Sequence, residues 1–294
     1  MRLWPALAVA ATLTCPGPVQ AEEAGVKSEN SGAVTDSEHI FGFTEGTDIG
    51  EKGEHEIEVT FVGSFGKVGR YANIFNESAF RYTWTDRLRL SVGVLSDFYS
   101  IHAVPGLANR TSTTISGIDA EARLSILDRR WAPIGLDIGV NPQWRHLDEV
   151  SGTDEQSVTM PTTLLVEKDI LPGFLYSAVN LTYTPGVSRL PSGSISNVAG
   201  QWQHADAFEV SAAASAVVAP NVLVGGELRH LSLAENGTFR AQAFFAGPSF
   251  YTRLSDNFEA KIAWSAQISD ISGSGLDLHS FDRNQVILLL SYTF

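Results

Sequence analysis

The chain has 294 residues, of which 44% are hydrophobic, and 33 acidic against 20 basic residues give a net charge of −13. This acidity excludes nucleic-acid binding as the main function, because neutralising phosphates requires clustered Lys and Arg. The single cysteine, Cys15, excludes a disulfide scaffold, a thiolate nucleophile and a cysteine-ligated zinc site. The sequence carries no cofactor-binding motif, so no cofactor and no metal are expected.

The amino-terminal residues 1–21 have the layout of a secretory signal peptide. Arg2 precedes an apolar stretch at 3–13, and small or β-branched residues end at Ala21. We therefore expect cleavage after Ala21. A lipoprotein signal that uses Cys15 is the weaker interpretation, since its surroundings make a poor lipobox.

Residues 22–53 are rich in Gly, Ser, Glu and Asp, which favours a flexible periplasmic leader. One apolar island interrupts this composition, at Ile40, Phe41 and Phe43. A solvated leader has little reason to carry two Phe. The alternative is therefore that these three residues insert into the lumen of a barrel as a plug.

Residues 54–294 alternate apolar and polar side chains with a period of two, which predicts β-strands rather than helices. The twelve candidate strands lie at 56–61, 79–84, 87–94, 118–126, 134–141, 158–166, 175–183, 208–218, 222–228, 239–251, 258–268 and 286–294. The stretch 239–251 is ambiguous, because its aromatic residues fall on both faces.

The connections alternate between short and generally longer ones, and this alternation is typical of transmembrane barrels. The short set lies at 85–86, 128–132, 170–172, 219–221 and 255–257, and long members of the other set lie at 101–112, 146–156, 186–197 and 270–280. A mean hydropathy of +0.01 is consistent with strands that face lipid on one side only. The predicted fold is all-β: a transmembrane antiparallel up-and-down barrel of about twelve strands, with short periplasmic turns and longer extracellular loops.

The last strand carries an apolar stripe that ends the chain at Leu290, Tyr292 and Phe294. This ending resembles the final strand of bacterial outer-membrane β-barrels. The resemblance implies the outer membrane of a Gram-negative bacterium, contact with outer-membrane lipid, and an assembly signal read by the barrel assembly machinery after delivery by periplasmic chaperones. Segments 41–53 and 247–264 also resemble barrels near the phenol-degradation meta-pathway outer-membrane family, which implies uptake of small organic solutes.

Charged residues of both signs fall on the parity that would face the lumen. The candidates are Glu56, Glu58, Arg81, Arg89, Glu121, Arg123, Asp137 and Arg145. Buried charges must be paired or hydrated. Cross-strand ion pairs that brace a narrow barrel are one interpretation, and the lining of a water-filled path that selects solutes is the other.

The loop at 146–156 concentrates acidic residues, including Asp148 and Glu149. Oxygen ligands suit calcium, but the spacing matches no known metal loop. We expect this loop to be solvated.

We expect a non-enzymatic channel for passive movement of an unidentified small solute. A non-conducting structural or binding barrel is the first alternative. The second is a lipid hydrolase, because His230-Leu231-Ser232 resembles the His-x-Ser pair of outer-membrane phospholipase A. The partner that would orient the histidine is missing, since the next strand offers Gln242 and Phe244 instead.

Overall fold

The computed structural model describes residues 36–191, 200–270 and 275–294. The predicted signal peptide lies outside these ranges. Within them no helix is long and apolar enough to cross a membrane. The strands are β1 (His55–Phe65), β2 (Arg70–Thr85), β3 (Leu88–His102), β4 (Arg110–Leu127), β5 (Gly135–Val140), β6 (Gln143–Leu147), β7 (Asp154–Thr159), β8 (Thr162–Leu171), β9 (Leu175–Arg189), β10 (Gln203–Ala219), β11 (Val222–Glu235), β12 (Thr238–Ser255), β13 (Phe258–Asp270) and β14 (Asn284–Thr293).

Two prolines divide two of the strands into halves. Pro142 separates β5 from β6, and Pro161 separates β8 from β7, because proline has no N–H to donate to the ladder. The ladder is bridged at these points: the Asn141 amide donates to the Pro161 carbonyl at 2.9 Å, and the Ala120 amide donates to the Pro142 carbonyl at 3.1 Å. Since β5 and β6 pair with the same strand, β4, and β7 and β8 both pair with β9, the fourteen segments form the predicted twelve strands.

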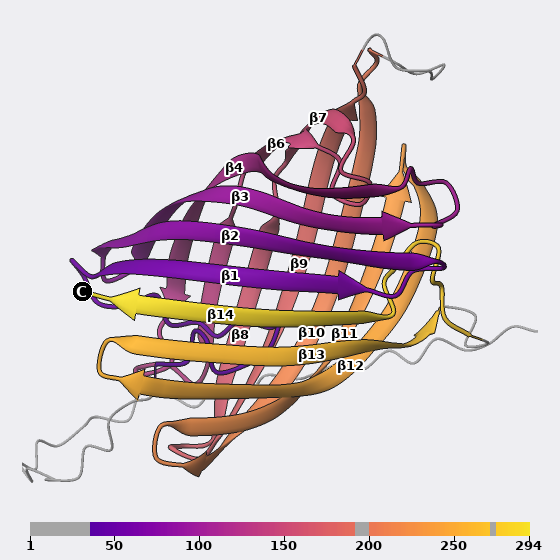
Figure 1. Cartoon of the computed structure of the whole chain (residues 1–294). Helices are drawn as coiled ribbons and strands as arrows, with labels where there is room; N and C mark the ends of the chain where they lie inside the picture. The colour runs from indigo at the N-terminus through magenta and orange to yellow at the C-terminus, as the bar shows by residue number, and fades with distance from the viewer. Residues whose placement is uncertain (1–35, 192–199, 271–274) are drawn as a thin grey trace, which may run out of the picture. The chain divides into compact units, whose positions relative to one another are not determined.

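The sheet closes on itself. Each strand runs antiparallel to its neighbours, and the first strand pairs with the last in a register that places Val59 opposite Leu290. Closure leaves none of the described strands with an unpaired edge, which is what a spanning sheet requires in lipid. Figure 1 shows β14 lying beside β1, and the predicted all-β antiparallel barrel is confirmed.

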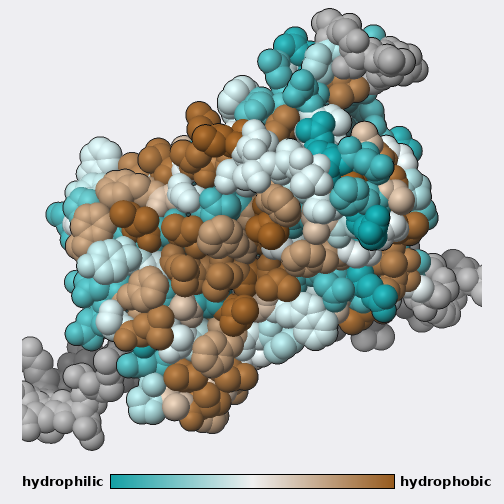
Figure 2. Space-filling view, viewed as in Figure 1, coloured by the Kyte–Doolittle hydropathy of each residue, from teal (hydrophilic) through white to brown (hydrophobic). Residues whose placement is uncertain are grey.

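The outer face of the wall is apolar, as the period-two pattern predicts. Exposed apolar side chains on it include Ile57, Phe80, Val92, Ile118, Leu124, Val179, Leu181, Val224, Leu228, Ile262 and Trp264. Figure 2 shows brown side chains over the strands that face the viewer, such as β14, β1 and β2, with hydrophilic side chains gathered toward the end at which β1 and β3 finish. An apolar band between polar rims is the surface that contacts the hydrocarbon of a bilayer.

The two ends of the barrel differ in their connections. At the end where β1 begins, which we call the turn end, neighbouring strands are joined by short turns such as residues 86–87 and 256–257. The opposite, loop end carries longer connections such as 103–109. The predicted alternation of short turns and generally longer loops is confirmed, and the prediction places the turn end in the periplasm.

At the loop end, the acidic loop is bound to the inner wall. The Tyr71 hydroxyl donates to the Val150 carbonyl at 3.1 Å, and the Tyr99 hydroxyl donates to the Asp148 carbonyl at 3.1 Å. The expectation of a simply solvated loop is wrong for its backbone, although the Glu149 carboxylate faces solvent. The sequence shows that the loop is charged, but it does not show that backbone carbonyl groups of the loop accept hydrogen bonds from the wall.

The aromatic residues of β12 fall on both faces because both faces have partners. Phe245 and Tyr251 point inward and are 0% and 1% exposed, whereas Phe250 points outward. The Phe245 ring meets the edge of Phe281, from the loop before β14, with centroids 6.2 Å apart. Aromatic residues therefore occur on the inner face of β12 because chain segments inside the lumen pack against them.

An ion pair between β3 and β6 is expected to stabilise the loop end. Arg145 Nη2 lies 2.5 Å from Asp97 Oδ2, with side chains 4% and 0% exposed. Asp97→Ala leaves a buried guanidinium without this partner and is expected to lower the free energy of unfolding by about 3–5 kcal/mol. The exposed pair Arg240–Glu235 is the matched control, since Glu235→Ala should cost only about 0–1 kcal/mol. Urea unfolding in lipid vesicles measures both, and equal losses would contradict the assignment.

Candidate functional site

Residues 36–50, which we call the inner segment, lie inside the barrel at the turn end. Ile40 and Phe41 are 1% and 0% exposed and pack against inward side chains of four strands, including Tyr176 and Tyr251. The Ser215 hydroxyl donates to the Ile40 carbonyl at 2.7 Å. Figure 1 shows the inner segment as an indigo coil within the ring of strands. Its apolar island therefore occupies the lumen, the position that the plug interpretation requires.

Phe43 meets a cation. Its ring lies under the guanidinium of Arg229, on β11, at 4.0 Å from the centroid. A guanidinium over an aromatic face is attracted by the negative face of the ring. All three apolar residues of the island thus contact the wall, two by apolar packing and one by a cation–π contact.

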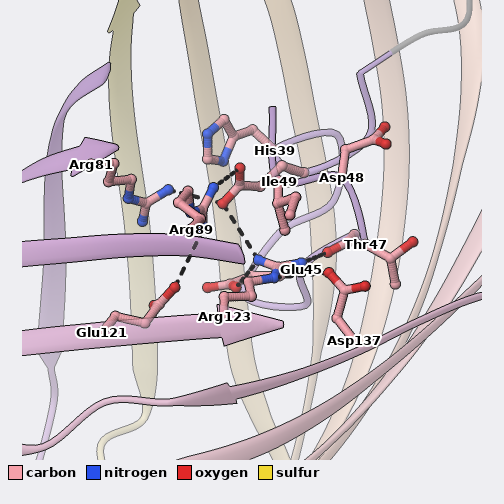
Figure 3. A network of polar contacts seen from close by, with 12 residues as sticks. His39, Glu45, Thr47, Asp48, Ile49, Arg81, Arg89, Glu121, Arg123 and Asp137 are labelled. Carbon is pink, nitrogen blue, oxygen red and sulfur yellow. Dashed lines mark hydrogen bonds and ion pairs between the residues drawn. The ribbon is translucent and has the colours of Figure 1, made fainter. Parts of the chain in front are cut away.

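Glu38 is the electrostatic anchor of the inner segment. Its carboxylate, only 4% exposed as a residue, accepts hydrogen bonds from Arg81 at 2.9 Å, from Arg123 at 3.4 Å and from Arg89. The register places Arg89 directly opposite Arg123 on neighbouring strands, an arrangement that like charges disfavour. A carboxylate between them removes that repulsion. Figure 3 shows the three guanidinium groups converging from β2, β3 and β4.

The wall also pairs these arginines among its own strands. Arg81 lies 2.7 Å from Glu58, Arg89 lies 3.4 Å from Glu121, and Arg123 lies 3.1 Å from Asp137. These contacts are cross-strand ion pairs, as the bracing interpretation requires. The same arginines also pair with Glu38 of the inner segment. The structure places all eight predicted lumen residues in the interior: Glu58, Arg81, Glu121 and Arg123 line a central cavity, Glu56, Arg89 and Asp137 surround the inner segment, and Arg145 lies at the loop end.

Two further wall carboxylates accept hydrogen bonds from the backbone of the inner segment. Glu167 accepts from the Thr47 amide at 2.6 Å, and Glu227 accepts from the Phe43 and Thr44 amides at 2.7 and 3.2 Å. Amide-to-carboxylate bonds are charge-assisted and stronger than neutral ones. The inward parity of both residues is visible in the sequence, but their use by a segment outside the sheet has no sequence signal.

His39 lies between two glutamates of β1. Its Nε2 is 3.3 Å from Glu56 and 3.5 Å from Glu58. Burial alone lowers the pKa of His39, but Glu38, Glu56 and Glu58 outweigh it and raise the pKa to about 9. Glu38, His39 and Glu56 are close enough to share a metal ion. Because guanidinium groups already contact the Glu38 oxygens, the group fits an ion-pair cluster better than a metal site.

Docking of the inner segment is therefore expected to weaken at alkaline pH. A histidine whose pKa is raised on docking contributes stability that is complete below its ordinary pKa of 6.5 and is lost as the pH rises through about 9. We expect channel open probability to rise between pH 7 and pH 10. His39→Gln should remove most of that rise, whereas His55→Gln, at the start of β1, should leave it intact. An identical pH profile in all three proteins would refute the role of His39.

Two cavities lie inside the wall, and a hollow lies at the turn end. The central cavity of about 310 Å³ has Phe43 and Glu45 among its lining residues. A second one, of about 190 Å³, lies toward the loop end and shares the lining residue Gln143 with it. The hollow has a volume of about 590 Å³ and is lined by residues that include Gly50 and Trp131. Most of the hollow is lined by residues of the turns at the rim, and it shares no lining residue with the central cavity.

The residues of the hydrolase alternative do not form a catalytic pair. His230 Nε2 lies 3.2 Å from the Gln242 side-chain oxygen, and its ring packs on Phe244 with centroids 4.6 Å apart. Among the residues that the structure describes, no hydrogen bond joins His230 to Ser232. Gln242 and Phe244 are the two residues that the sequence predicts opposite His230. Neither has a carboxylate that could orient the histidine ring.

The predicted assembly signal lies at the turn end. The Phe294 amide donates to the His55 carbonyl at 2.9 Å, and its ring stacks on His55 with centroids 5.7 Å apart. Tyr292 stacks on Phe294 with centroids 6.2 Å apart, and Leu290 pairs with Val59. In the folded barrel these residues complete the seam between β14 and β1.

The closed twelve-stranded wall, apolar outside and charged inside, defines an outer-membrane β-barrel of porin-like architecture. The chain belongs to the family described as "Family of unknown function (DUF6662)", whose model matches residues 33–294. No curated protein matches the sequence.

Solved structures share this fold at low identity. The crystal structure of the COG4313 outer membrane channel from Pseudomonas putida F1 matches with a TM-score of 0.55 and 13% identity, covering 84% of this chain and 98% of that one. The translocator domain of the autotransporter NalP from Neisseria meningitidis matches with a TM-score of 0.51 and 10% identity, covering 84% and 91%. The recognition of an outer-membrane barrel from the sequence is confirmed.

Proposed function

We propose that the protein is a passive outer-membrane channel for small solutes and that the inner segment closes its turn end in the state described. The observation that carries the proposal is the pair of cavities inside the wall, which share the lining residue Gln143, with Phe43 and Glu45 of the inner segment among the residues that line the central one. The similarity in fold to an outer-membrane channel supports it.

Only non-covalent contacts hold the inner segment against the wall, and the segment forms no strand of the sheet. Its anchors are side-chain contacts: the arginines at Glu38 and the carboxylates Glu167 and Glu227. A segment held in this way can leave without breaking a single pair of the wall ladder. The wall would then enclose a continuous path lined by charges of both signs.

We further propose that Phe294 serves the assembly machinery before it completes the seam with His55. The resemblance of the carboxyl-terminal strand to those of outer-membrane barrels supports this role. Phe294 is also 57% exposed at the rim, so it buries little area in the folded barrel. Its place at the end of β14 leaves it accessible until β1 pairs with β14.

Conductance of the refolded mature chain in a planar bilayer tests the channel function. Gly139 lines the central cavity, and a Cβ there would meet open space. We therefore expect Gly139→Trp to lower the unitary conductance, whereas Ile138→Trp, on the lipid-facing side of the same strand, should not. Unchanged conductance in Gly139→Trp would show that ions bypass the lumen, and silence of both a folded wild-type barrel and a barrel freed of residues 22–53 would favour the non-conducting alternative.

A further inference from the structure

We propose that the central cavity binds a small zwitterionic solute through Lys261 at one side and Glu77 at the other. This inference names a solute class for the channel function proposed above and rests on that function for its role in transport. The binding itself depends only on the cavity.

Lys261 is a buried ammonium group with no partner of its own. The residue is 2% exposed and lines the central cavity, and none of the described residues forms a hydrogen bond or ion pair with it. Buried lysines are almost always paired. Two carboxylates on which its charge acts, Glu45 and Glu227, are already engaged: Glu45 lies 3.3 Å from Arg123, and Glu227 accepts backbone amides of the inner segment. A negative group from a solute would complete its surroundings.

Glu77, at the other side of the cavity, lies in a concentration of acidic groups. It hydrogen-bonds to Asp119, the charges of Glu58 and Glu121 also act on it, and no described basic side chain forms an ion pair with it. Arg81, the one positive group among those neighbours, is already bonded to Glu38 and Glu58. A positive group from a solute would relieve this concentration of negative charge.

The sheet register brings the two groups into one row. Lys261 pairs with Leu289, Leu289 pairs with Thr60, and Thr60 pairs with Glu77, on four consecutive strands. Neighbouring strands lie about 4.7–4.9 Å apart, so the Cα atoms of the two charged residues are about 14 Å apart along the wall. All four residues line the central cavity. The order along the row is ammonium, apolar side chain, hydroxyl and carboxylate.

A solute with a carboxylate at one end and an ammonium at the other matches this row. Leu289 and the adjacent Ile287 offer apolar contact to a short hydrocarbon chain between the charges. A simple anion would leave the acidic side unsatisfied, and a simple cation would leave Lys261 unsatisfied. The cavity volume of about 310 Å³ is at the small end of ligand sites, which limits the solute to a few heavy atoms beyond its charged groups.

Equilibrium dialysis of the refolded mature chain in detergent tests the proposal, with 6-aminohexanoate, hexanoate and hexylammonium as probes. Each charged contact should contribute about tenfold or more, so 6-aminohexanoate should bind at least about tenfold more tightly than either singly charged probe. Lys261→Met should abolish the advantage over hexylammonium, and Glu77→Gln should abolish the advantage over hexanoate. Lys168→Met, at an exposed lysine on β8, is the matched control and should change neither ratio.

Lys261→Arg guards against a folding defect, since it keeps the charge and should keep the preference if the barrel runs as a heat-modifiable band. Equal binding of all three probes, no binding of 6-aminohexanoate, or an undiminished preference in Lys261→Met would overturn the zwitterion site. If the barrel conducts but shows no preference for 6-aminohexanoate, the proposed solute class is wrong and the proposed channel function stands. If the barrel binds 6-aminohexanoate but does not conduct, the binding site stands and the proposed channel function is wrong.

Discussion

Glu38→Gln is expected to convert a mostly closed barrel into a mostly open one. The substitution keeps the shape of the side chain and removes the charge that three buried guanidinium groups share. Removing one partner of a buried ion pair costs about 3–5 kcal/mol, because the remaining charge is left uncompensated. Here the cost applies only while the inner segment is docked, since water reaches the arginines once the segment leaves. The ratio of open to closed barrels should therefore rise roughly 10²–10⁴-fold.

Open probability in planar bilayers measures this effect. Glu51→Gln is the matched control: Glu51 follows the inner segment, is exposed and pairs with no arginine in the described structure. It should leave the open probability unchanged. Glu45→Gln should have an intermediate effect, because Glu45 pairs with Arg123 alone and its side chain is 47% exposed. Equal open probabilities in wild type and Glu38→Gln would mean that the arginines do not hold the barrier.

The strands were predictable because the alternation of polar and apolar residues within each strand is sufficient to identify it. In the first strand, Glu56 and Glu58 alternate with Ile57 and Val59, and this alternation alone decides which side chains face lipid. The interruptions at Pro142 and Pro161 were not predicted, since the period-two pattern runs on across a residue that lacks an N–H. They alter the ladder locally and leave the count of twelve strands unchanged.

The contents of the lumen were less predictable because they depend on which strands become neighbours. Arg89 and Arg123 are about thirty residues apart in sequence, and only the register shows that they oppose each other and need an anion between them. The same holds for Lys261 and Glu77, which the closure between β14 and β1 brings into one row. Sequence alone did supply one signal for the lumen, the apolar island of the inner segment, because exposed Phe residues are unfavourable in a solvated leader.

A disulfide between residues 47 and 135 is expected to hold the inner segment in place even without Glu38. Gly135 starts β5, and a Cβ there would overlap the Thr47 hydroxyl and lie 2.9 Å from the Thr47 Cβ. Disulfides join Cβ atoms about 3.8 Å apart, so a shift of less than about 1 Å accommodates the bond. Cys15 is the only cysteine of the chain and falls in the predicted signal peptide, which leaves the engineered pair free of competing thiols. The triple variant Glu38→Gln, Thr47→Cys, Gly135→Cys should be closed when oxidised and should reach the open probability of Glu38→Gln after reduction.

This reversal separates movement of the inner segment from a general loosening of the barrel. If Glu38→Gln opened the lumen by distorting the wall, a covalent link at Thr47 would leave the currents high. If the inner segment is the barrier, the oxidised barrel must be silent while its strands stay folded. The variant Glu38→Gln, Thr47→Cys has one thiol, cannot form the link and should stay open under both conditions. Currents that ignore a disulfide verified by mass spectrometry would exclude the inner segment as the gate and leave the arginines of β2, β3 and β4 as braces of the wall.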